Sequence, residues 1–85
     1  MNKKIHDLGK IVLESHNKMK PLSIRRKISL KLTLAEKMFV EVDKESIQGM
    51  INNLLSNAIK NTPPSGKIEV SLASENHFAA LKVKD

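Results

Sequence analysis

The clearest hydrophobic pattern in the chain lies between residues 43 and 61, where apolar side chains recur at helical spacing. The apolar positions are Ile47, Met50, Ile51, Leu54, Leu55, Ala58 and Ile59. Their separations of three and four residues predict a helix that buries one face in a core. Asp43 is a suitable N-cap, and Pro63 disfavours helical geometry at the residue before it. We therefore expect a helix over residues 43–61.

The rest of the chain predicts a second helix and several short strands. Residues 3–20 show helical periodicity, and we expect Pro21 to end or kink this helix. Alternation of apolar and polar residues predicts strands at residues 27–34, 38–42, 67–73 and 77–84. The order helix, two strands, helix, two strands predicts an α+β fold. We expect one domain, a two-layer α/β sandwich with both helices on one face of a four-stranded mixed sheet.

The length and composition indicate a single small domain with an aliphatic core. The 85 residues include two phenylalanines and no Trp, Tyr or Cys. The absence of Cys excludes a disulfide framework and a thiolate metal site, and it fits a reducing, cytoplasmic compartment. His6 and His16 have no His, Asp or Glu cluster at metal-binding spacing around them, so we expect both to be surface residues.

The positive charge is concentrated in the first part of the chain. Residues 1–37 hold ten Lys or Arg and three Asp or Glu, a balance of +7, whereas residues 38–85 hold five and six, a balance of −1. Arg25, Arg26 and Lys27 form a basic run that we expect to be solvated. Such a surface can attract nucleic acid, an anionic ligand or an acidic partner. We expect no nucleic-acid partner, because the sequence has no Tyr, Trp or Arg-Gly elements for base stacking.

A polar stripe accompanies the helix predicted at residues 43–61. Asn53 and Asn57 are four residues apart and Lys60 follows three later, so at about 100° per residue they share a narrow sector beside the apolar face. An asparagine inside a helix costs roughly 0.7 kcal/mol relative to alanine. For Asn52 and Ser56 a solvated face explains the polar residue, whereas Asn53, Asn57 and Lys60 are candidate binding residues.

These candidates belong to a stretch that resembles the N-box of sensor histidine kinases. The stretch reads Asn53-Leu54-Leu55-Ser56-Asn57-Ala58-Ile59-Lys60-Asn61-Thr62-Pro63. The strands expected before and after the helix also resemble those of the family's ATP-binding domain, whose fold is shared with gyrase-type and Hsp90-type ATPases. The resemblance covers essentially the whole chain. It implies a domain of a two-component kinase that binds Mg-ATP and transfers the γ-phosphoryl group to a histidine.

The resemblance also implies roles for single residues, none of them catalytic. Asn57 would coordinate Mg²⁺, for which an amide oxygen is a suitable hard ligand. Asn53 would line the phosphate region or hold a metal-bound water. Because an amide cannot take a proton from water, this asparagine suits phosphoryl transfer to histidine rather than hydrolysis. Lys60 would contact a phosphate oxygen, and Asp85 would accept a hydrogen bond from the adenine amino group.

The family's pattern continues beyond Asp85 with glycine-rich boxes and a lid, so the sequence corresponds to the N-terminal half of the domain. We expect this half to be inactive alone. In the parent kinase, whose membrane anchor would leave this domain in the cytoplasm, the partners would be a response regulator and the dimerisation helices. An open edge at the last strand predicts self-association through residues 78–84. The alternative is a non-catalytic interaction module that uses this edge.

Overall fold

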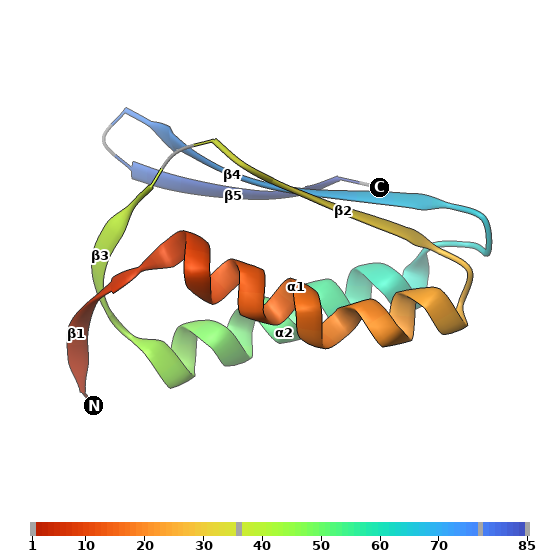
Figure 1. The fold of residues 1–85 in the computed structure, drawn as a ribbon, viewed down its shortest axis with the longest axis horizontal. Helices are drawn as coiled ribbons and strands as arrows, with labels where there is room; N and C mark the ends of the chain where they lie inside the picture. Colours follow the sequence, from red (N-terminus) through yellow and green to blue (C-terminus); the bar gives the residue numbers. More distant parts are fainter. Residues whose placement is uncertain (1, 36, 77, 85) are drawn as a thin grey trace.

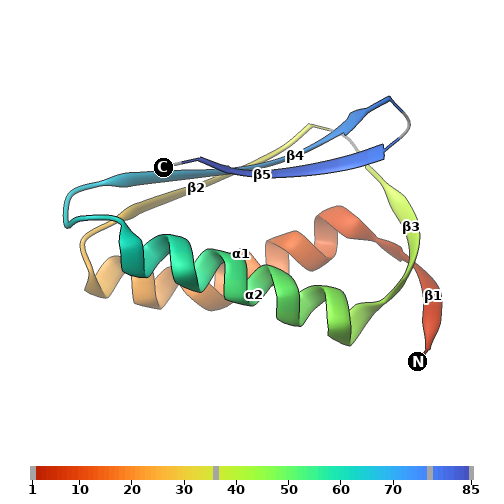
Figure 2. The ribbon, with the colours of Figure 1, turned by 180° about the vertical axis from the view of Figure 1, so that it is seen from behind.

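The computed structural model describes residues 2–35, 37–76 and 78–84, which form two helices and five strands in two layers (Figure 1). The elements are β1 (Lys3–Asp7), α1 (Leu8–Arg25), β2 (Ser29–Leu34), β3 (Phe39–Asp43), α2 (Lys44–Asn61), β4 (Lys67–Glu75) and β5 (Phe78–Lys84). The two helices run side by side beneath one face of a sheet, as both views show (Figures 1 and 2). In the described part of the chain, neither α1 nor α2 combines the length and the hydrophobicity of a membrane-spanning helix.

The larger sheet has three strands in the order β2-β4-β5. β2 is parallel to β4, with Leu30 opposite Ile68, and β5 is antiparallel to β4, with Leu81 opposite Leu72. The α+β class and the two-layer arrangement are therefore as predicted. The predicted strand at 38–42 forms as β3, but it does not join this sheet: it pairs antiparallel with β1 in a second, two-stranded sheet. The expected four-stranded sheet is thus a three-stranded one in the described residues.

The core lies between the larger sheet and the two helices, and its buried hydrophobic residues in the described part of the chain are aliphatic. Its buried members are Ile11, Val12, Ile28, Ile51, Leu55, Ile59, Ile68, Val70 and Leu72. Three come from α2 and three from β4, the central strand, whose alternate residues face the helices. Burial of these side chains is the main stabilising term of so small a domain.

The N-terminal region differs from the predicted helix at residues 3–20. Residues 3–7 form β1 because they pair with β3, a partner more than thirty positions away that local periodicity cannot reveal. Asp7 then caps α1, accepting a hydrogen bond from the backbone N–H of Gly9 at 3.0 Å. Pro21 lies inside α1, which continues to Arg25. In this last turn Ser23 is buried, and its hydroxyl donates to the Lys20 carbonyl at 2.7 Å.

Candidate functional site

Helix α2 carries the candidate residues, and contacts at both of its ends hold it in place. At its start, Asp43 accepts a hydrogen bond from the backbone N–H of Ser46 at 3.4 Å, so the predicted N-cap is confirmed. At its end, Thr62 has extended geometry before Pro63, as expected for a residue that precedes proline. The Thr62 hydroxyl donates to the Ala58 carbonyl at 2.8 Å, satisfying one of the carbonyls that a helix end leaves open.

Arg26 supplies a second cap for the same helix end. Its Nε donates to the Ile59 carbonyl at 3.2 Å and its Nη2 donates to the Lys60 carbonyl at 3.3 Å. The prediction that the whole run from residue 25 to 27 is solvated is therefore wrong for Arg26. A guanidinium at a helix C-terminus also opposes the partial negative charge of that end. The turn after α1 thus positions the segment that bears Lys60.

The predicted binding residues Asn53, Asn57 and Lys60 are all exposed on α2. The buried face of this helix is narrower than the apolar pattern suggested, because Met50 is 58 % exposed and Leu54 is 43 % exposed. The polar stripe consequently lies farther from the core than expected, and exposed apolar side chains separate the two. The structure places all three candidates on one helix, and Arg26 from the turn after α1 contacts the backbone of Lys60.

Met50, which is exposed on α2, also lines an apolar groove beside β5. The groove measures about 150 Å³ and lies between α1, α2 and the strands β4 and β5. Its lining residues are Leu8, Val12, Ile47, Met50, Ile51, Leu72, Ala79 and Leu81. Asn57 follows Leu54 by three residues and Met50 by seven, spacings that place all three on the same side of the helix. The lining is apolar throughout and includes none of the three candidates, so Met50 is the α2 side chain that connects their side of the helix with the groove.

Asp85, the predicted adenine contact, lies outside the described residues. Asn52, which was expected on a solvated face, is half-buried beside Ile51 and Leu55, and its Oδ1 is buried without a hydrogen-bond partner in the described part of the chain. Ser56 is also half-buried. Across residues 2–35, 37–76 and 78–84, no three His, Asp or Glu side chains lie close enough together to hold a metal ion.

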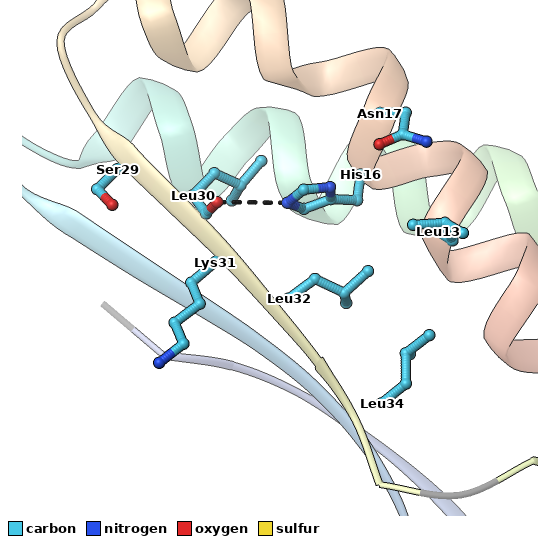
Figure 3. Close-up of a pocket in the computed structure, with 8 residues that line it drawn as sticks. All are labelled: Leu13, His16, Asn17, Ser29, Leu30, Lys31, Leu32 and Leu34. Carbon is cyan, nitrogen blue, oxygen red and sulfur yellow. Dashed lines mark hydrogen bonds between the residues drawn. The ribbon is translucent and has the colours of Figure 1, made fainter.

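His16 is buried, so the prediction that it lies at the surface is wrong. It is only 8 % exposed, its Nε2 lies 3.3 Å from the Leu30 carbonyl oxygen, and its Nδ1 is buried without a partner among the described residues (Figure 3). The spacing of four from the buried Val12 was the available signal, because it places His16 on the core side of α1.

Comparison with known proteins identifies the fold. Among solved structures, the catalytic domain of histidine kinase ThkA is 21 % identical over 98 % of this chain and 57 % of its own, with a TM-score of 0.90. ThkA in complex with the response regulator TrrA gives a TM-score of 0.86 at 22 % identity, over 95 % of this chain and 25 % of that chain. No protein-family model and no curated protein sequence matches this chain.

Two further kinases have the same fold. The cytoplasmic segment of histidine kinase QseC is 20 % identical, with a TM-score of 0.82, and the match covers 86 % of this chain and 49 % of that one. Histidine kinase AdeS of Acinetobacter baumannii is 22 % identical, with a TM-score of 0.81, over 98 % and 41 %. The chain therefore has the fold of part of a sensor histidine kinase catalytic domain, as the N-box resemblance implied. It spans little more than half the length of the ThkA domain.

Proposed function

We propose that this chain forms part of the ATP-binding domain of a sensor histidine kinase in a two-component system. The observation that carries the proposal is the placement of the N-box-like stretch. It lies on α2, in a chain that shares its fold with histidine kinase catalytic domains, and its Asn53, Asn57 and Lys60 have exposed side chains. Met50, seven residues before Asn57 on the same helix, lines the apolar groove beside β5.

The side chains present suit Mg-ATP. Asn57 would hold Mg²⁺ through its amide oxygen, and the bound metal would neutralise charge on the phosphates. Asn53, one turn earlier, would orient the phosphate region or a metal-bound water, and Lys60 would place an ammonium group near a phosphate oxygen. Asp85 would hold the adenine amino group. Because Asn53 cannot act as a base toward water, the set favours transfer to a protein side chain over hydrolysis.

The parent kinase would transfer the γ-phosphoryl group of ATP to a histidine on its own dimerisation helices. Its partner would be a response regulator, since a kinase of this fold, ThkA, has been solved in complex with one. The domain would act in the cytoplasm, as the QseC segment of the same fold does. We expect the 85 residues alone to bind nucleotide weakly and to be inactive.

A nucleotide titration followed by NMR tests the proposal. Mg-ATP added to the chain should shift the amide signals of Asn53, Asn57 and Lys60, with roughly millimolar affinity because an open helix face encloses little of the ligand. Asn57→Ala should remove the Mg²⁺-dependent part of these shifts. Asn17→Ala, the same change at an exposed position of α1, is the matched control and should leave them unchanged.

Shifts that are equal in Asn57→Ala and in the unaltered chain would remove Asn57 from the metal site. A dissociation constant below about 10 µM would contradict the expectation that these residues are only part of the site. No response anywhere on α2 would favour the alternative function, a non-catalytic interaction module. That alternative rests on the position of β5 at one edge of the larger sheet.

A further inference from the structure

The other edge of the larger sheet borders an open groove that the proposed nucleotide site does not use. β2 is the edge strand, and between it and α1 runs a groove of about 660 Å³ (Figure 3). Leu30, Leu32 and Leu34 extend from β2 toward α1, where Leu13 and His16 form the facing wall. Leu13 is 41 % exposed and Leu34 is 39 % exposed, so the groove has apolar side chains in contact with solvent.

The backbone of β2 has unpaired hydrogen-bonding groups along this groove. Ser29 and Ala35 direct their N–H groups to β4, donating to the carbonyls of Gly66 and Leu72 at 3.0 Å each. Because alternate residues of a strand face opposite neighbours, Leu30, Leu32 and Leu34 direct theirs to the groove. On the groove side of β2, the hydrogen-bond partner found among the described residues is the His16 ring, which lies at the Leu30 carbonyl. The groups of Leu32 and Leu34 therefore remain available to an added strand.

The outer face of the sheet shows what charge an added strand should carry. Lys31 lies opposite Glu69 of β4, and Glu69 lies opposite Lys84 of β5, so charges alternate in a row across three strands. The Lys31 side chain extends away from α1, onto that outer face (Figure 3). The next strand beyond β2 would continue the alternation with an acidic residue, since opposite charges on adjacent strands attract and like charges repel.

We propose that the β2 edge binds an extended acidic segment of a partner protein, which adds to the sheet as a further strand. Apolar residues of the segment would enter the groove beside Leu13, Leu32 and Leu34. The residues between them would be acidic and would lie beside Lys31. Backbone bonds to an exposed edge provide affinity in this mode of recognition, and the alternating side chains provide specificity.

The charge around the groove favours this occupant over a second copy of the chain. A neighbouring hollow, which shares Leu13 and Leu34 with the groove, is also lined by Lys10 and Lys37. Its acidic residue, Asp7, is engaged as the cap of α1. A second copy would bring the lysines of its own edge strands against Lys31, whereas an acidic segment meets a positive surface.

A synthetic peptide of alternating Val and Glu, titrated into the full 85-residue chain, tests the proposal. We expect saturable binding and slower hydrogen exchange at the Leu32 and Leu34 amides. Lys31→Glu should weaken binding about tenfold, because an attractive cross-strand pair becomes a repulsive one, and it should favour a peptide of alternating Val and Lys. Lys18→Glu changes the net charge equally on the exposed side of α1 and should leave affinity within about twofold.

Each other outcome would overturn the proposal. These outcomes are no binding, protection of residues 78–84 in place of Leu32 and Leu34, or an unchanged peptide preference in Lys31→Glu. Concentration-dependent protection of Leu32 and Leu34 without any peptide would assign the edge to a second copy instead. Because the exchange measurement uses the unaltered chain, the test does not depend on the folding of any variant. A failed ATP titration leaves it unaffected.

Discussion

Replacement of Arg26 by alanine tests whether one side chain joins the end of α1 to the end of α2. Arg26 donates to the carbonyls of Ile59 and Lys60, at 3.2 and 3.3 Å. Hydrogen bonds from a charged donor contribute about 1.5–3 kcal/mol each when buried. The bond to Ile59 is only partly buried and the bond to Lys60 is exposed, so solvent reduces both contributions. We expect a net loss of about 1–2 kcal/mol from the free energy of unfolding.

Thermal unfolding followed by circular dichroism measures this loss. For a domain of this size, about 1 kcal/mol corresponds to a shift of roughly 4–8 °C in Tm, so Arg26→Ala should lower Tm by roughly 5–15 °C. Arg25→Ala is the matched control. Its side chain is exposed in the last turn of α1, and its loss should cost only a few tenths of a kcal/mol.

Arg26→Lys should lie between the two, because an ammonium keeps the charge at the helix end but cannot donate to both carbonyls in a planar fork. Equal changes in Tm for Arg25→Ala and Arg26→Ala would show that the contact to α2 adds nothing beyond the loss of a surface charge. The same result would show that the turn after α1 does not fix the position of Lys60, and our account of this helix end would be wrong.

The remaining predictions concern two glycines and the β5 edge. Gly66→Ala should destabilise the fold by about 1–3 kcal/mol in urea titrations, since a Cβ there overlaps the Thr62 methyl group and lies 2.9 Å from the Pro63 carbonyl oxygen. Gly49→Ala, in open space on α2, should instead stabilise the fold by about 1 kcal/mol. A lower free energy of unfolding in this variant would refute the open surroundings of Gly49. The chain should associate through β5 at about 100 µM in analytical ultracentrifugation. A monomer with fully exchange-protected amides at residues 78–84 would contradict this.

The sequence was informative wherever a local pattern and the tertiary structure agree. Ile51, Leu55 and Ile59 recur at helical spacing and are buried as predicted, and Asp43 and Pro63 bound the helix that they form. The alternating residues of β4 likewise face the core as expected. In each case the same residues specify both the local geometry and the buried face, so a single periodicity is enough.

The predictions failed where distant segments decide the outcome. Residues 3–7 have helix-compatible periodicity but pair with β3, and the cap made by Arg26 depends on the position of the end of α2. His16 illustrates the same limit, since its partner is a carbonyl of β2. For the candidate site, the sequence located Asn53, Asn57 and Lys60 on a helix, but it could not show that Met50 and Leu54 remain exposed beside them.

The anchoring of α2 at both ends has a consequence for regulation in the kinase proposed above. Asp43 holds its first turn, Arg26 and Thr62 hold its last, and Leu55 is fully buried between them. To tilt or shift this helix would break these bonds and expose core side chains at once. In the proposed kinase, an input signal would therefore act at lower energetic cost on the parts that approach α2 than on α2 itself. The helix itself would stay fixed, and the movement of other segments would decide whether a ligand can bind to its exposed face.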